Sequence, residues 1–222
     1  MTRVILVRHG RTTANKSGIL AGRADVELDD IGREQAVRAG RRLADLQLAA
    51  VVTSPMLRTR QTAELLLAAR EDPPVPQLDD GLAEVEYGDW TGRSLAELAD
   101  DPLWGVVQQA PAAVTFPGGE AMAAMAARAV ASVRRWARDP GAEGVVVVVS
   151  HGDVIKAVLA DALGMHLDSF QRIVVNPGSI SAVSYSHGRP FVERVNDCGD
   201  GLADLQAAPP EQATPGGTTG SG

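Results

Sequence analysis

Short apolar runs alternate with stretches of helical periodicity along this chain. Runs of about four to eight apolar residues bounded by turn residues are typical of buried strands. The five consecutive valines from Val145 to Val149 give the strongest signal of this kind. Strands are expected at residues 4–7, 49–53, 75–78 (a short edge strand), 145–149, 180–186 and 190–195.

Helical patterns lie between these runs. Residues 30–47 carry apolar side chains at near-helical spacing. Ser54 and Pro55 fit an N-cap followed by a first-turn proline, which predicts a helix over residues 54–69. Because strands alternate with helices, the order predicts an α/β fold with a mainly parallel sheet layered by helices. Further helices are expected at residues 120–138 and 153–163.

Three segments lack regular periodicity. Residues 79–93 are rich in glycine, aspartate and aromatic residues and predict an irregular segment at the sheet edge. Residues 93–117 hold three prolines and Trp104, and we expect a small cap over a site there. Residues 199–222 carry Pro-Pro and Gly-Gly pairs and predict a disordered tail. One folded domain over residues 1–198 follows.

Composition narrows the function classes. The 222 residues carry a formal charge of −7, which argues against general binding to nucleic acid or to an anionic membrane. A single cysteine, Cys198, excludes a disulfide framework and a thiolate metal site. No apolar run approaches the roughly 18 residues of a membrane span, and the N-terminus lacks the pattern of a signal peptide. We therefore expect a cytoplasmic protein.

Two histidines follow two of the predicted strands. Arg8, His9 and Gly10 come directly after the run at 4–7, and His151 comes after the valine run. In open α/β sheets, ligands collect at the carboxyl ends of the strands. Arg58 lies near the first turn of the helix expected at residues 54–69, where unpaired N–H groups and a guanidinium together favour an anion. These positions predict a site for an anionic group such as a phosphate.

The motifs together resemble one enzyme family. They are Arg8-His9-Gly10 with Thr12 and Asn15, then Gly22, then Ser54-Pro55 with Arg58 and Gln61-Thr62-Ala63, then the segment from Leu82 through Glu84, Gly88 and Trp90 to Gly92, and finally Ser150-His151-Gly152. In this order they resemble branch 1 of the histidine phosphatase superfamily, the phosphoglycerate mutase-like proteins, over about residues 2–198. The resemblance implies a three-layer α/β/α sandwich with a mainly parallel mixed sheet.

The resemblance also implies roles for individual residues. His9 is expected to be the nucleophile that becomes a phosphohistidine, and Glu84 the proton donor to the leaving group, with Glu86 as its nearby competitor. A neutral His9 requires that its other ring nitrogen donate to a backbone carbonyl. The expected phosphate-binding residues are Arg8, Asn15, Arg58, His151 and Gly152. No cofactor is expected, and no residue spacing suggests a metal site.

Phosphatases and mutases of this family share these residues, so the segments that contact the rest of the substrate must distinguish the two activities. In residues 93–117 the only base is Arg93, against Glu97, Asp100 and Asp101, which disfavours a second anionic group and favours a phosphatase. The alternatives are a phosphomutase of the cofactor-dependent phosphoglycerate mutase type and a catalytically silent phosphate-binding regulator. The expected partner is a small phosphorylated metabolite, and the chain is expected to be a monomer or homodimer. Candidate substrate contacts are Arg11, Ala21 and Gly22.

The remaining histidines and large apolar residues are expected to be structural. His166 and His187 fit surface positions. The stripe that contains Met122 and Met125 fits a core-facing helix.

Overall fold

A computed structural model describes residues 2–139, 144–186, 189–199 and 215–216. Its centre is a six-stranded sheet in the order β3-β2-β4-β1-β5-β6. The strands β3, β2, β4 and β1 are parallel to one another, whereas β5 pairs antiparallel with β1 and β6 pairs antiparallel with β5. The strands are β1 (Thr2–Arg8), β2 (Leu48–Thr53), β3 (Gln77–Leu78), β4 (Gly144–Ser150), β5 (Ile180–Ser186) and β6 (Arg189–Asp197).

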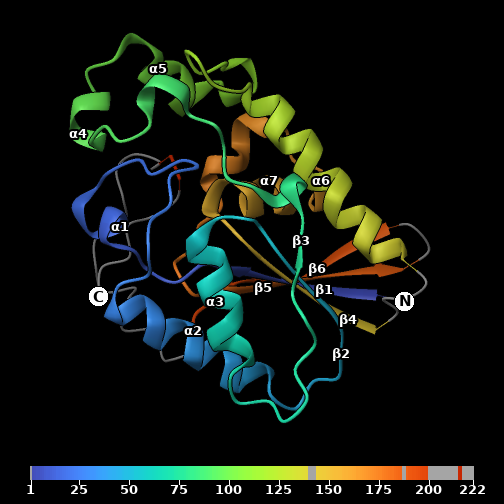
Figure 1. Ribbon diagram of the computed structural model, residues 1–222. Helices are drawn as coiled ribbons and strands as arrows, with labels where there is room; N and C mark the ends of the chain where they lie inside the picture. The colour runs from blue at the N-terminus through green and yellow to red at the C-terminus, as the bar shows by residue number, and fades with distance from the viewer. Residues whose placement is uncertain (1, 140–143, 187–188, 200–214, 217–222) are drawn as a thin grey trace.

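Helices cover both faces of this sheet. The helices α2 (Asp30–Leu43) and α3 (Leu57–Leu67) lie on one face, and α6 (Met122–Arg138) and α7 (Gly152–Ala162) lie on the other (Figure 1). Successive side chains of a strand point to opposite faces, so β1 divides its residues between the two layers. Ile5 and Val7 pack with α2 and α3. Val4 and Leu6 pack with α6 and α7. The expected three-layer sandwich with a mainly parallel mixed sheet is confirmed.

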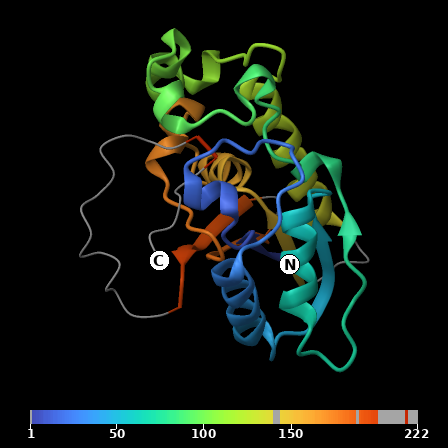
Figure 2. The same ribbon diagram turned by 60° about the vertical axis from the view of Figure 1, so that its left-hand side comes forward.

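Shorter elements gather at the carboxyl edge of the parallel strands. The helix α1 (Thr13–Ser17) follows β1, and α4 (Leu95–Leu98) and α5 (Pro102–Gln109) stand above the same edge (Figure 2). Backbone hydrogen bonds join the two regions, with Leu20 N donating to Arg93 O at 3.0 Å and Leu95 N donating to Gly18 O at 2.8 Å. The 3₁₀ turns are η1 (Asp80–Leu82), η2 (Gly88–Trp90), η3 (Pro111–Ala113) and η5 (Leu167–Arg172).

Several element boundaries differ from those expected. The helix expected at residues 54–69 begins at Leu57, and Met56 rather than Ser54 is its N-cap. The Ser54 hydroxyl is instead 2.7 Å from His151 Nε2, a contact between distant parts of the chain that local sequence does not reveal. The helix expected at residues 30–47 ends at Leu43. The strand expected at residues 75–78 is confined to Gln77–Leu78.

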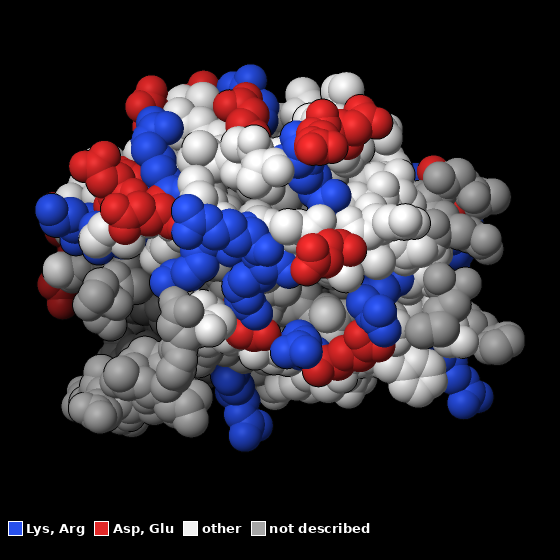
Figure 3. Space-filling model, turned by 90° about the horizontal axis from the view of Figure 1, so that it is seen from below, with Lys and Arg blue, Asp and Glu red and all other residues white. Residues whose placement is uncertain are grey.

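The stripe with Met122 and Met125 is fully buried in the core, as expected. No helix in the described ranges has both the length and the hydropathy of a membrane span. On the face seen from below, a group of basic side chains is bordered by acidic ones (Figure 3).

The disorder expected for residues 199–222 falls mainly on residues outside those described. Besides Gly199, the residues Pro215 and Gly216 of that stretch are described, and they lie beside α7 and the loop after β1 (Figures 1 and 2). The Pro215 side chain is buried and Gly216 is partly buried.

Candidate active site

The two motif histidines lie side by side because their strands pair. The parallel register of β1 and β4 sets Arg8 opposite Ser150, so the residues that follow them leave the sheet together. The His9 and His151 rings have centroids 5.4 Å apart and planes inclined at 62°. Both side chains are at least 97% buried, since His9 is 3% exposed and His151 0%.

The His9 ring is held in one tautomer. Its Nδ1 lies 2.7 Å from the carbonyl oxygen of Gly10, and because a carbonyl only accepts, Nδ1 carries the proton and donates. The other nitrogen, Nε2, is therefore left with its lone pair. Burial, together with the charges of Arg58 and Arg8, lowers the pKa of His9 well below its ordinary value. The imidazole of His9 therefore stays neutral at neutral pH.

Two buried guanidinium groups flank His9. Arg58 donates from Nη1 to Ala24 O at 3.1 Å and from Nη2 to Gly22 O at 2.6 Å. Arg8 donates from Nη1 to Val175 O at 2.7 Å. Burial lowers the pKa of Arg8 to about 10, which leaves it charged at neutral pH. Carbonyl oxygens fix these groups without cancelling their charge, so the pocket is prepared for an anion.

His151 caps the buried end of α7. It occupies the N-cap position, and Gly152 is the first helical residue, so the N–H groups of the first turn open toward the pocket. Its Nε2 is the atom that contacts the Ser54 hydroxyl. Its Nδ1 is buried without a hydrogen-bond partner among the described residues and lies 3.9 Å from Glu84 Oε2. Burial lowers the pKa of His151 well below its ordinary value, as does the charge of Arg58.

Glu84 faces the same pocket from the segment between η1 and η2. It is 3% exposed, and its Oε1 accepts a hydrogen bond from Val85 N at 3.0 Å. Burial raises the pKa of Glu84 to about 7, and the nearby charge of Asp153 adds to the rise. Glu86, its competitor in the sequence, has a side chain that is 53% exposed and pairs with Arg23 at 3.1 Å. Of these two acidic residues, Glu84 is the one that is buried and lines the pocket.

The other predicted contacts divide into two groups. Asn15, Ala21 and Gly22 line the pocket together with His9, Arg58 and Glu84. Arg11 is not one of the described residues that line this pocket. Its Nε donates to Asp29 Oδ2 at 2.7 Å, and its backbone N–H donates to Gln35. The expectation that Arg11 contacts substrate is not supported, since the carboxylate at the start of α2 holds it.

Several residues at the site had no signal in the sequence. Arg128, on α6, donates from Nη1 to Ala83 O at 2.6 Å and from Nη2 to Glu84 O at 3.0 Å. It thereby holds the segment that carries Glu84. An arginine inside a regular helix carries no mark of this role, because its partners lie 44 and 45 residues away in sequence.

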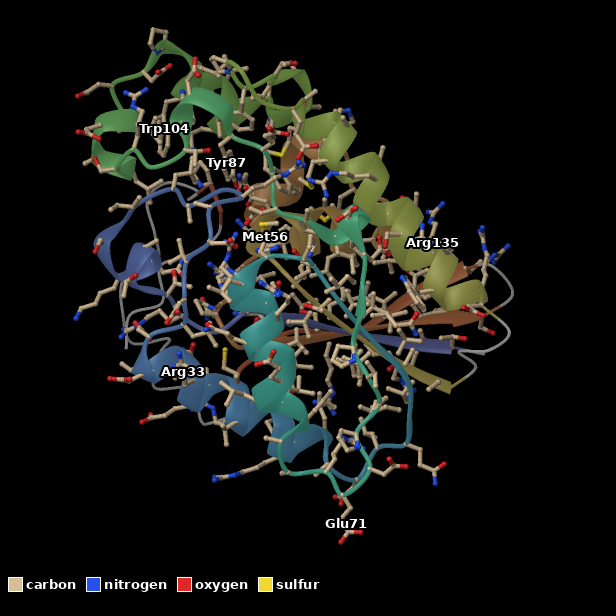
Figure 4. All side chains as sticks on the ribbon, in the orientation of Figure 1. Arg33, Met56, Glu71, Tyr87, Trp104 and Arg135 are labelled. Atoms are coloured by element: carbon tan, nitrogen blue, oxygen red, sulfur yellow. The ribbon has the colours of Figure 1, made fainter. Side chains whose placement is uncertain are left out.

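Tyr87 and Asp153 form a second buried contact beside the pocket. The Tyr87 hydroxyl donates to Asp153 Oδ2 at 2.9 Å, and both side chains are fully buried. Figure 4 shows Tyr87 between the start of α3, marked by Met56, and the cap helix that carries Trp104. Tyr87 lies within the family motif, but its position alone did not indicate this contact.

Other candidate locations carry no comparable chemistry. Among the described residues, no group of three or more His, Cys, Asp or Glu side chains is placed to hold a metal ion. A groove of about 970 Å³ between α6 and α7 is lined by alanine and other apolar residues together with three arginines and two aspartates, and it includes neither motif histidine. His166 has a 73% exposed side chain, as expected, and His187 lies outside the described residues.

Comparison with known proteins agrees with this arrangement. A glucosyl-3-phosphoglycerate phosphatase of Mycolicibacterium vanbaalenii is 35% identical over 175 residues, which cover 76% of this chain and 77% of the relative. A probable phosphoglycerate mutase of Erwinia tasmaniensis is 31% identical over 187 residues, covering 83% and 86%. Among solved structures, Bacillus stearothermophilus YhfR superposes with a TM-score of 0.82 and 31% identity, covering 89% of this chain and 98% of that one.

Sequence, fold and site therefore agree on one family. The model of the histidine phosphatase superfamily, branch 1, matches residues 4–198. That range contains both histidines, both buried arginines and Glu84. The chain belongs to branch 1 of the histidine phosphatase superfamily.

Proposed function

We propose that this chain is a metal-independent phosphatase that hydrolyses small phosphomonoesters through a phosphohistidine on His9. The observation that carries the proposal is a neutral histidine between two buried guanidinium groups. Its free Nε2 faces the same pocket as a carboxyl group whose pKa is raised to about 7. The phosphatase relative described above adds support.

In the first step, His9 Nε2 attacks phosphorus while the bond from phosphorus to the ester oxygen breaks. Arg8 and Arg58 hold the non-bridging oxygens, with further donors from the His151 ring, the Gly152 N–H and the Asn15 amide. For His151 to donate from Nδ1, the Ser54 hydroxyl donates to Nε2. Protonated Glu84 gives its proton to the leaving alkoxide. The products are the alcohol and a phosphohistidine.

In the second step, water attacks the phosphohistidine. Glu84, now a carboxylate, takes a proton from this water, and the bond between Nε2 and phosphorus breaks. Inorganic phosphate leaves, His9 is neutral again and Glu84 is protonated for the next cycle. The same residues serve both steps because the second reverses the chemistry of the first.

Phosphomutase activity is the second candidate, favoured by the likeness to a probable phosphoglycerate mutase. Against it, the only base of residues 93–117, Arg93, has Asp101 at 3.4 Å, so it is not free to grip a second anionic group. Incubation with 3-phosphoglycerate and 2,3-bisphosphoglycerate separates the two. We expect slow release of phosphate, whereas rapid formation of 2-phosphoglycerate would establish a mutase.

Replacement of His9 tests the nucleophile. We expect His9→Ala to lower kcat for p-nitrophenyl phosphate by about 1000-fold or more, with loss of the acid-labile phosphoenzyme, because the variant lacks the nitrogen that attacks phosphorus. His166→Ala, a change at an exposed histidine, is the matched control and should retain activity. Equal activity of the two variants would refute the assignment. A wild-type protein without turnover or phosphoenzyme would instead be the silent regulator.

Replacement of Glu84 tests the proton carrier. Glu84→Gln should slow hydrolysis of alkyl phosphates by about 100-fold or more, and that of p-nitrophenyl phosphate far less, because a good leaving group needs no proton. Glu86→Gln, at the exposed neighbour, is the control and should leave this ratio unchanged. A uniform loss for both leaving groups in Glu84→Gln would contradict the role.

We propose that the substrates are small phosphorylated metabolites, that the enzyme acts in the cytoplasm, and that it is a monomer or homodimer. Cell fractionation and light scattering on the purified protein test the last two points.

A further inference from the structure

A buried carboxylate next to the phosphate pocket has no part in the two steps above. Asp153 lies in the first turn of α7, directly after His151 and Gly152, and is fully buried. Its Oδ2 accepts the hydrogen bond from the Tyr87 hydroxyl at 2.9 Å, and its Oδ1 lies 3.4 Å from Lys156 Nζ. Lys156 is itself buried and reaches Gln171 Oε1 at 2.8 Å. Lys156 balances the charge of Asp153 through Oδ1, so Asp153 Oδ2 is the oxygen that accepts from other donors.

The chain itself shows what this carboxylate binds. Gly216 N donates to Asp153 Oδ2 at 2.8 Å, and Gly216 O accepts from Arg8 Nη2 at 3.1 Å. Gly216 thus bridges a guanidinium assigned to phosphate and a carboxylate with no assigned ligand. The backbone N and O of one residue are only about 3 Å apart, as bond lengths dictate. An acceptor on Arg8 and a donor on Asp153 therefore fit as neighbours in one small ligand.

This pair of contacts has a direct counterpart in a phosphomonoester. If a phosphate oxygen takes the hydrogen bond from Arg8, the donor on Asp153 belongs to the leaving alcohol, a few bonds away. A carboxylate oxygen only accepts hydrogen bonds, so the partner must carry a donor, as the Gly216 N–H does. On the leaving alcohol of a small phosphorylated metabolite, that donor is a hydroxyl or an ammonium group. An apolar side chain also lies at this point, since a Cβ on Gly216 would be 3.4 Å from Leu20 Cδ1. An alkyl group there would leave Asp153 Oδ2 without this bond.

We propose that Asp153 determines substrate specificity by accepting a hydrogen bond from a hydroxyl or ammonium group on the carbon next to the ester carbon. The inference rests on the proposed phosphatase function and names its substrate class: monophosphates of 1,2-diols and of 1,2-amino alcohols. Asp153 acts on the leaving group, and it takes no part in proton transfer to the ester oxygen.

Matched substrates test this assignment. Hydroxyethyl phosphate and aminoethyl phosphate differ from propyl phosphate only at one terminal group. We expect kcat/KM of the wild type to favour the two donor-bearing substrates at least about tenfold, because a buried charged acceptor discriminates strongly against a missing donor. In Asp153→Asn this ratio should fall about tenfold. The ratio cancels any loss common to all substrates. Equal kcat/KM values for the three phosphates in the wild type would overturn the proposal.

Two further variants locate the effect. Asp161→Asn changes a partly exposed aspartate on the same helix, paired with Arg134, and should keep the wild-type ratio. Tyr87→Phe removes the tyrosine hydroxyl that donates to Asp153 Oδ2 and should keep or increase the ratio of kcat/KM values. This variant tests the proposal even if Asp153→Asn fails to fold. Loss of the ratio in Tyr87→Phe would assign the discrimination to the tyrosine and refute the role of Asp153.

A binding measurement separates this inference from the proposed function. The Kd values of the three phosphates for the His9→Ala variant report the Asp153 contact without turnover. If the wild type hydrolyses none of them but the Kd values still differ about tenfold, the phosphatase proposal fails and the donor site stands. If hydrolysis proceeds and neither Kd nor kcat/KM distinguishes them, only the donor site fails.

Discussion

At the scale of single residues, burial opposes charge on the two side chains to which we assign the chemistry, His9 and Glu84. It lowers the pKa of His9 and raises that of Glu84 to about 7. The histidine therefore keeps its lone pair, and the carboxyl group keeps its proton, at the same pH. Arg58 strengthens the first effect and weakens the second, since a cation repels a proton from either group. The desolvation of Glu84 outweighs the opposing attraction from Arg58.

These shifts predict the pH dependence of catalysis. We expect kcat/KM for an alkyl phosphate to fall as pH rises through about 7, because Glu84 then loses the proton that the leaving group needs. The acid limb should lie well below pH 6.5, where His9 becomes protonated. A pH profile of the wild type and of Glu84→Gln checks this, since the variant should lack the limb near 7. An identical alkaline limb in both would exclude Glu84 as its source.

The raised pKa of Glu84 also has a cost in stability. The folded pKa lies above the unfolded value of 4.5, so the folded protein holds this proton more tightly, and the corresponding stability is lost as pH rises from about 4.5 through 7. Glu84→Gln, which cannot ionise, should escape that loss. The variant's free energy of unfolding relative to wild type should therefore rise between pH 4.5 and 8, by up to about 3 kcal/mol. Denaturant unfolding at both pH values measures this, and a pH-independent difference would contradict it.

At the scale of elements, the loop after β1 packs against α2 through close contact between two glycines. A Cβ on Gly10 would lie 2.2 Å from Gly32 O, and a Cβ on Gly32 would lie 2.0 Å from Arg11 O. Side chains never come that close to backbone atoms, so α2 can approach the loop after β1 only with glycine at both positions. The Gly10 carbonyl that fixes the His9 tautomer lies in this contact.

Gly32→Ala should separate α2 from this loop. We expect a loss of about 2 kcal/mol in the free energy of unfolding, the usual size for overpacking against backbone, together with a lower kcat. Gly105→Ala is the control, because no heavy atom of the described residues lies within 4 Å of its added Cβ. That change in α5 should be neutral or slightly stabilising, as alanine favours a helix. Similar unfolding energies for both variants would argue against the contact.

Sequence patterns predict features that depend on local periodicity, and they miss contacts between distant parts of the chain. Arg8, His9 and His151 follow apolar runs, so the strand pattern was enough to predict that they meet at one edge. The start of α3 was misplaced because Ser54 contacts a histidine 97 residues away rather than capping its own helix. Arg11 is not among the residues that line the pocket, and its guanidinium donates to Asp29. Patterns report periodicity along the chain, and these partners are set by the fold.

At the scale of the whole molecule, distant segments compete for the pocket. Gly216 holds the same Arg8 nitrogen and Asp153 oxygen that we assign to substrate, so both cannot bind at once. No sequence motif predicts the contacts of Gly216 with Arg8 and Asp153. The composition of residues 199–222 predicts only a disordered tail. The competition is accessible to kinetics.

Gly216→Ala should weaken this competition. The residue has a φ of 77°, in the left-handed region, where alanine costs about 1 kcal/mol more than glycine. We therefore expect KM for hydroxyethyl phosphate to fall by up to about fivefold, with kcat unchanged. Gly164→Ala, at a φ of 67° with no described atom within 4 Å of the Cβ, is the control. An unchanged KM in Gly216→Ala would show that residues 215–216 do not hinder substrate binding.

The position of β1 in the sheet also has a consequence for folding during synthesis. Its two neighbours, β4 and β5, comprise residues 144–150 and 180–186, so the strand made first among the six acquires its partners late. During synthesis, the four apolar residues of β1 stay without a partner strand until β4 has emerged from the ribosome. Pairings of such sequence separation fold slowly and expose strand edges to aggregation. A nascent chain of this protein should therefore bind chaperones until the valine run is complete.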